Sequence, residues 1–182
     1  VGGDLTNAGD TVITVAVTGS CRGEPVRRSG ARAGDLIWVT GPLGGSAAGL
    51  RLLRDRPGPP VLPGGEVALG GGRREGDAPS GNSGGGGPAA AAEADAMRAH
   101  ARPVPRLAAG RAARQAGATA MIDVSDGLAA DLGHIATQSG VGIELDRVPI
   151  HPAATLEEAL TGGEDFALVF CAPGSASVAA TF

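Results

Sequence analysis

The chain has 182 residues, a formal net charge of −4 and 42% hydrophobic residues, which is enough for one packed core. No apolar run approaches the roughly 18 residues that span a bilayer, and the acidic balance gives no reason to expect a nucleic-acid partner. Cys21 and Cys171 have no metal-binding spacing, which indicates a reducing compartment. We therefore expect a cytoplasmic protein with no membrane attachment.

Residues 1–54 contain two predicted strands and one helix. Thr11–Thr18 and Asp35–Thr40 are short and rich in β-branched and apolar residues, as strands are. Gly and Pro interrupt the pattern at residues 41–45. An apolar helix follows, with Ser46 as its expected N-cap.

A Gly/Pro-rich segment comes next. Between residues 57 and 88, 18 of 32 residues are Gly or Pro. Such a composition cannot bury enough apolar surface to offset the entropy of ordering, so it predicts a disordered insertion at about 55–92. The alternative is a stretch of drifted or mistranslated sequence, and neither interpretation makes it a site.

The second block alternates helices and strands. Pro105 suits the first turn of a helix, and Ser125 is the expected N-cap of another helix whose apolar residues recur at helical spacing. This alternation around one sheet predicts an α/β or α+β class without fixing the strand order. The predicted elements are helices at 105–115, 125–135 and 152–160, and strands at 120–124, 141–145 and 166–171.

Asp123, Ser125 and Asp126 form the sharpest local motif, within Ile-Asp-Val-Ser-Asp-Gly-Leu. Magnesium takes carboxylate oxygens and keeps other positions for water and phosphate. The N-terminus of the following helix would offer free N–H groups to a phosphate. The alternative is that Ser125 is only a cap and Asp126 only balances the helix dipole, and the isolated motif favours that alternative.

Two further acidic glycine turns strengthen the first interpretation. They are Gly2-Gly3-Asp4 and Gly162-Gly163-Glu164-Asp165. Together the three turns indicate a site for a metal-bound phosphate ester. Arg28 is a candidate phosphate clamp, because a guanidinium group matches phosphate oxygens, although a solvated surface arginine is an equal alternative.

Several other chemistries are excluded. The glycines at 41–45 resemble a dinucleotide-binding turn only loosely, because the acidic residue expected about 20 positions later falls inside the Gly/Pro-rich segment, and a chain without lysine has no P-loop lysine. No Gly-x-Ser-x-Gly or Cys–His pattern marks a nucleophile, so we expect no protein nucleophile. Phosphoryl transfer needs none, because it relies on positioning and on charge neutralisation.

A series of motifs, taken in order, resembles the thiamine-monophosphate kinase family and covers the chain outside the Gly/Pro segment. Distant relatives of that family include aminoimidazole ribonucleotide synthetase and selenophosphate synthetase. The motifs are Gly2-Gly3-Asp4-x-Thr6, Arg28-Ser29-Gly30-Ala31-x-x-Gly34-Asp35, Val39-Thr40-Gly41, Arg102-Pro103-x-Pro105-Arg106, Ile122-Asp123-x-Ser125-Asp126-Gly127-Leu128, Asp131-Leu132-Gly133-His134-Ile135 and Gly162-Gly163-Glu164-Asp165-Phe166.

The resemblance implies an α+β fold, with an α/β-type mixed sheet and flanking helices. Residues 1–20 would be the remnant of an N-terminal ATP-binding domain, and 21–182 an incomplete C-terminal domain. The whole enzyme, as a homodimer, would use ATP and Mg²⁺ to convert thiamine phosphate to thiamine diphosphate. By position, the Mg²⁺ ligands would be Asp4, Asp123 and Asp126; the ATP contacts Gly3, Asp4, Arg28 and Ser125; and the substrate contact Glu164.

The departures from the family matter for activity. The family's N-terminal metal cluster and its final segment are missing from this sequence, so we expect this chain alone to have little or no kinase activity. Two alternatives stay open. One is a sister ATP-dependent enzyme with another substrate, and the other is a non-catalytic remnant that binds a partner.

Overall fold

The structure is a computed structural model and describes residues 16, 18–21, 23–55 and 87–174. In these ranges three strands form one sheet in the order β1-β3-β2: β1 (Asp35–Val39), β2 (Ala120–Asp123) and β3 (Leu168–Pro173). These three predicted strands are confirmed, whereas the predicted strand at 11–18 lies almost wholly outside the described residues. Both pairings are antiparallel, and parallel pairing among the described residues is limited to one bridge, between Leu43 and Ile150.

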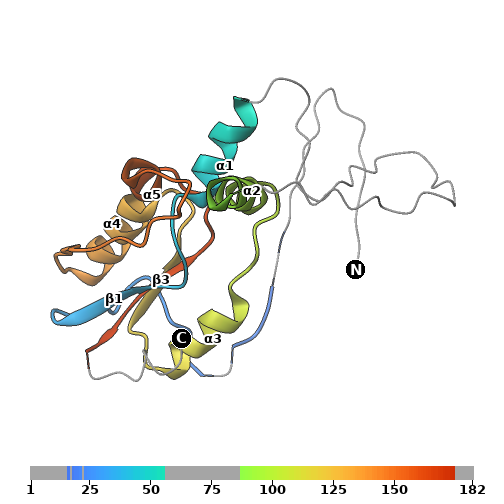
Figure 1. Ribbon diagram of the computed structural model, residues 1–182. Coiled ribbons are helices and arrows are strands. Elements are labelled where there is room, and N and C mark those ends of the chain that lie inside the picture. Colours follow the sequence, from blue (N-terminus) through green and yellow to red (C-terminus); the bar gives the residue numbers. More distant parts are fainter. Residues whose placement is uncertain (1–15, 17, 22, 56–86, 175–182) are drawn as a thin grey trace, which may run out of the picture.

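Helices lie on both faces of the sheet and at one end of it (Figure 1). Helix α4 covers one face, with α5 packed against α4, and α3 covers the other, while α1 and α2 pack against each other. No helix in the described ranges is long and apolar enough to cross a bilayer. The helices are α1 (Gly45–Arg54), α2 (Pro88–Ala101), α3 (Leu107–Gln115), α4 (Leu128–Ser139) and α5 (Leu156–Thr161).

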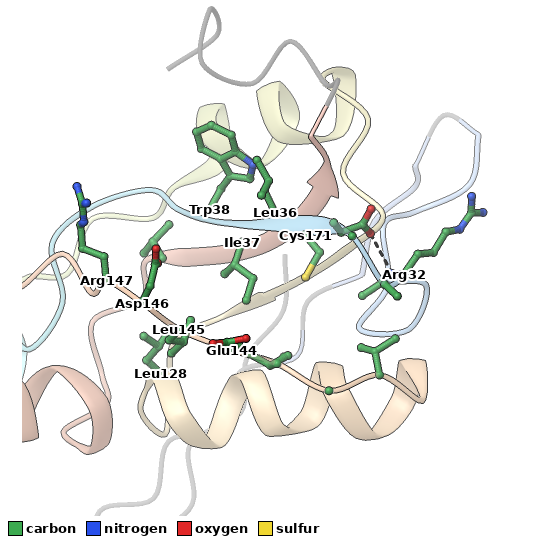
Figure 2. A pocket seen from close by; sticks show the side chains of 18 of the residues that line it. Arg32, Leu36, Ile37, Trp38, Leu128, Glu144, Leu145, Asp146, Arg147 and Cys171 are labelled. Atoms are coloured by element: carbon green, nitrogen blue, oxygen red, sulfur yellow. Dashed lines mark hydrogen bonds between the residues drawn. The ribbon is translucent and has the colours of Figure 1, made fainter.

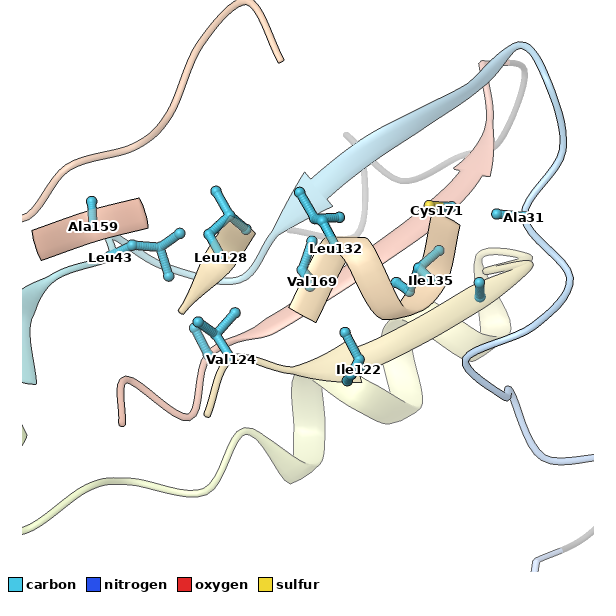
Figure 3. Close-up of a cluster of buried hydrophobic side chains, with 12 residues drawn as sticks. Ala31, Leu43, Ile122, Val124, Leu128, Leu132, Ile135, Ala159, Val169 and Cys171 are labelled. Atoms are coloured by element: carbon cyan, nitrogen blue, oxygen red, sulfur yellow. The ribbon is translucent and has the colours of Figure 1, made fainter. Parts of the chain in front are cut away.

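The central strand β3 is buried on both faces. Val169 and Cys171 pack in the main core with Leu132 of α4, a cluster shown in Figure 3. The alternate residues Phe170 and Ala172 pack on the other face with Ala113 of α3. Since successive side chains of a strand point to opposite faces, a strand between two helical layers needs a continuous apolar run, and Leu-Val-Phe-Cys-Ala supplies it.

Helix α2 is the main element that the sequence pattern does not predict. Its alanine-rich sequence has no clear apolar stripe, although alanine favours helix and Pro88 suits its first turn. The predicted limit of the insertion, at about residue 92, is therefore wrong, because residues 88–92 are already helical. Gly49 of α1 lies directly against the backbone of Ala96, so the two helices pack very closely.

The predicted helix starts also need correction. Helix α1 follows Gly44 (φ 83°) and α4 follows Gly127 (φ 112°), and as glycines these two N-cap residues have no side chain with which to cap the helix. Ser46 therefore lies inside α1, and Ser125 precedes α4 without capping it. Helix α5 starts later than predicted, because Thr155 and Glu158 form a reciprocal capping box there.

The predicted strand at 141–145 is wrong. Residues 141–149 run near β1 as irregular chain, and the two segments line opposite sides of a cavity of about 530 Å³ (Figure 2). Strand propensity depends on a neighbouring strand to pair with, and β1 pairs with β3 instead. None of the predicted site residues that the structure describes lines this cavity.

Candidate active site

Two of the acidic glycine turns lie against each other through backbone hydrogen bonds. The N–H of Val124 donates to the carbonyl of Ala167 (2.8 Å), and the N–H of Phe166 donates back to Val124 (2.9 Å). The N–H of Glu164 donates to the carbonyl of Ser125, also at 2.8 Å. These bonds continue the pairing of β2 with β3 past the ends of both strands. Residues 123–126 and 163–167 thus form one structural unit.

Gly163 permits this close approach. Its φ of 65° lies in the left-handed region, and a Cβ there would collide with the carbonyl oxygen of Ser125. Both the conformation and the contact therefore require glycine. The sequence pattern Gly-Gly-Glu-Asp thus has a physical cause, because the turn packs directly on the Val-Ser-Asp segment.

Two residues of this turn other than glycine also have a strained backbone conformation. Glu164 (φ 54°) and Phe166 (φ 47°) are the two non-glycine residues with positive φ among the described residues. Such conformations cost of order 1–3 kcal/mol each and concentrate at functional sites. The Glu164 side chain is 65% exposed, with its Oε2 3.9 Å from Nδ1 of His100. The strained turn therefore presents Glu164 at the surface beside α2.

Asp165, the next residue, has a structural role. Its Oδ2 accepts a hydrogen bond from the N–H of Gly44 (2.7 Å), and its Oδ1 accepts one from the N–H of Ser46 (3.0 Å). Free N–H groups at a helix start need acceptors, and a carboxylate is favoured there by the helix dipole. Asp165 thus caps α1 from a distant part of the chain.

Asp131 belongs to the site, although the sequence motifs assigned it no function. It is 2% exposed, and its Oδ2 accepts hydrogen bonds from the N–H groups of Ser125 (3.0 Å) and Asp126 (3.1 Å). It lies in the first turn of α4 and fixes the backbone before that helix. Asp126 itself precedes α4, so the expectation that it occupies the first helical turn is wrong.

Three side chains at this junction approach one another closely enough to share a cation. Donor atoms of Asp126, Asp131 and His134 all lie within 4.8 Å of one another. The two carboxylates suit Mg²⁺, which prefers oxygen ligands, whereas the imidazole of His134 suits it less. The hydroxyl of Ser125 donates to Oδ1 of Asp126 (3.1 Å).

Asp123 does not belong to that group in the described part of the chain. It instead lines a groove of about 570 Å³ between β2 and α3, with Phe166 and the three arginines Arg106, Arg111 and Arg114. The structure therefore places the two carboxylates Asp123 and Asp126 on the same junction without gathering them around one point.

The predicted ATP contacts are spread further. The backbone carbonyl of Arg28 accepts a hydrogen bond from the hydroxyl of Ser139 (3.5 Å), at the C-terminal end of α4. Ser125 lies just before the N-terminal end of this 12-residue helix, which is about 18 Å long. The structure does not bring the backbone at Arg28 near Ser125. Gly3 and Asp4 lie outside the described residues.

Ion pairs hold the helices around the junction. Arg51 of α1 pairs with Glu158 of α5, with Nε and Oε1 2.7 Å apart, and this hydrogen bond lowers the pKa of Glu158. Hydrogen bonds from His151 and Arg98 likewise lower the pKa of Asp95 on α2. Charged groups thus tie α1 to α5, and α2 to the loop at His151.

Comparison with known proteins gives consistent results. No family model matches the chain. It is 38% identical to the thiamine-monophosphate kinase of Mycobacterium tuberculosis over 96% of this chain and 46% of that protein. For the Escherichia coli protein of the same name the identity is 36%, over 95% of this chain and 47% of that protein.

Solved structures of the same kind share the fold. The thiamine-monophosphate kinase of Stenotrophomonas maltophilia aligns with a TM-score of 0.65 and 33% identity, over 88% of this chain and 46% of that one. A structure named "AaThiL complexed with AMPPCP and TMP" aligns with a TM-score of 0.58 and 32% identity, over 81% and 42%. The α+β fold is confirmed. The chain is therefore a relative of the thiamine-monophosphate kinases that spans about half of their length, as its motifs indicated.

Proposed function

We propose that this chain is part of an enzyme that transfers a phosphoryl group from ATP to thiamine phosphate, giving thiamine diphosphate. In this proposal residues 21–182 belong to one domain and residues 1–20 end the preceding one. The complete enzyme is a homodimer. The sister-enzyme and remnant alternatives fit less well, because the relatives over this region share one name.

The observation that carries the proposal is the direct junction of the Val-Ser-Asp segment with the Gly-Gly-Glu-Asp turn. It places the exposed carboxylate of Asp126 and the exposed carboxylate of Glu164 on adjoining loops, held by the Glu164–Ser125 backbone hydrogen bond of 2.8 Å. A phosphoryl transfer requires that two substrates be held next to each other while charge is neutralised. A junction of two acidic turns suits that purpose.

The residues would divide the work as follows. Asp123 and Asp126, with Asp4, would hold Mg²⁺, which when bound neutralises phosphate charge. Asp131 fixes the backbone on which Asp126 stands. Ser125 and Arg28, with Gly3 and Asp4, would contact ATP, and Glu164 would contact the thiamine substrate. No side chain needs to act as a nucleophile.

A paired assay tests this proposal. The 182-residue chain is compared with a version extended at both ends to full length with the flanking segments of the M. tuberculosis relative. Each receives ATP, Mg²⁺ and thiamine phosphate, and thiamine diphosphate is detected directly. We expect activity only in the extended form, and its loss on Asp123→Asn or Asp126→Asn. A folded extended protein with no activity would contradict the proposal.

A further inference from the structure

A second cavity, of about 310 Å³, lies beside the candidate active site and has an unusual charged lining. The C-terminal part of α2 and the following loop supply three arginines, Arg98, Arg102 and Arg106. Two carboxylates, Asp95 and Asp165, also line it. The Arg-Pro-Val-Pro-Arg motif that carries two of these arginines has no role in the function proposed above.

Both carboxylates are already engaged by other groups. Asp165 accepts two backbone N–H groups of α1. Asp95 pairs with Arg98 (2.9 Å) and with His151 (3.2 Å). Within the described ranges, no ion pair or side-chain hydrogen bond engages the guanidinium group of Arg102 or Arg106. Two positive groups that line the cavity therefore lack an anionic partner.

The backbone holds these two arginines in place. Arg102 ends α2, where its N–H donates to the carbonyl of Arg98 (2.8 Å), and the carbonyl of Arg106 accepts from the N–H of Gly110 (2.9 Å) as α3 begins. The intervening Pro-Val-Pro segment has two fixed φ angles. The motif is thus a stiff connection between two helices with an arginine at each end.

The cavity adjoins the residues of the candidate active site. Asp165, from the Gly-Gly-Glu-Asp turn, forms part of its lining. Arg106 also lines the groove that contains Asp123 and Phe166. Its Nη2 would lie 3.5 Å from a Cβ at Gly41, so the side chain reaches the turn before α1. Arg106 therefore borders both the cavity and the groove.

We propose that this cavity is a phosphate-binding subsite in which Arg102 and Arg106 bind the oxygens of a phosphate ester. Guanidinium groups bind phosphate through paired, charge-assisted hydrogen bonds, and the stiff backbone between these two exposed arginines lowers part of the ordering cost. The assignment to a reacting substrate rests on the proposed function. Thiamine phosphate and ATP both present this chemistry.

Calorimetric titration of the 182-residue chain with inorganic pyrophosphate, at low salt, tests the subsite. We expect the double variant R102Q/R106Q to bind at least about tenfold more weakly. The control R147Q removes one positive charge in a different cavity, and we expect its affinity to stay within about twofold of the original chain. Equal weakening by R147Q, or unchanged binding in the double variant, would overturn the proposal.

Further titrations identify which substrate the subsite binds, and a second variant guards against misfolding. Titrations with thiamine phosphate and with ATP, both without Mg²⁺, show which ligand loses affinity in R102Q/R106Q. If that variant unfolds, R102K/R106K keeps the charge but loses the planar fork, and wild-type pyrophosphate affinity in it would overturn the proposal. No turnover is measured, so failure here is distinct from failure of the kinase assay.

Discussion

The carboxylate of Asp165 lies 2.7 Å from the backbone nitrogen of Gly44, although 121 residues separate them in the chain. This hydrogen bond joins the acidic turn before β3 to the start of α1. The neighbouring carboxylate of Glu164 is instead 65% exposed. Two consecutive acidic residues therefore have different roles, one structural and the other available to a ligand.

Removing the Asp165 carboxylate should destabilise the fold. In Asp165→Ala the N–H groups of Gly44 and Ser46 lose their acceptor, and we expect a loss of about 2 kcal/mol in the free energy of unfolding. Urea denaturation of the 182-residue chain measures it. The matched change Glu164→Ala should alter stability by less than about 0.5 kcal/mol, as for exposed sites generally. Equal losses in both variants would contradict this division of roles.

Gly163 should not tolerate a side chain. Gly163→Ala combines a left-handed φ of 65° with a collision against the carbonyl of Ser125, so we expect a loss of at least about 2 kcal/mol. Gly133→Ala is the control, because a Cβ at this position in α4 meets nothing within 4 Å. That change should stabilise by about 0.5 kcal/mol through helix propensity. Thermal unfolding distinguishes these outcomes, and a neutral Gly163→Ala would show that the turn does not pack as described.

Asp131 should act through the backbone of its neighbours. In Asp131→Ala the N–H groups of Ser125 and Asp126 lose a buried acceptor. We expect their amide hydrogens to exchange at least about tenfold faster, since a lost hydrogen bond of this kind is worth about 1.4 kcal/mol or more. Hydrogen exchange by NMR checks this, with the amides of β3 as an internal reference. Unchanged exchange at both amides would contradict the role of Asp131 in holding this backbone.

Stability should fall in acid through Glu158. Its pKa is lowered in the folded state by Arg51, so the pair stabilises the protein above the ordinary carboxyl pKa, and this contribution is lost as the pH falls through the folded value. The difference in stability between the wild type and Glu158→Gln should therefore be largest near pH 7 and shrink below about pH 4.5. Urea unfolding from pH 7 to pH 3 measures it, with Glu144→Gln as an exposed control. A difference independent of pH would mean that the charge of Glu158 contributes nothing.

Local patterns of apolar residues in the sequence correctly predicted several helices and strands. The apolar run at 166–171 marks a strand buried on both faces, and Leu128, Leu132 and Ile135 mark the core side of α4. Pairing between strands has no such local signal. Residues 141–145 have a strand-like composition and no neighbouring strand to pair with, so that prediction failed.

In the candidate active site, too, sequence patterns did not reveal contacts between distant residues. Composition and spacing indicated the acidic residues Asp123, Asp126 and Glu164. They did not show that Asp131 holds the backbone of Asp126 or that Asp165 caps α1, because both roles depend on contacts formed only after folding. Helix α2 was missed because its alanines give no apolar stripe, and its burial comes from close packing on Gly49.

Steady-state kinetics of the extended protein test the central claim, that the joined turns form one site for two substrates. Thiamine diphosphate formation is measured for the wild type, Asp126→Asn and Glu164→Gln while ATP and thiamine phosphate are varied separately. We expect Asp126→Asn to lower kcat at least about a hundredfold, and Glu164→Gln to raise the KM for thiamine phosphate about tenfold with that for ATP unchanged. Wild-type kinetics in both variants would contradict the account.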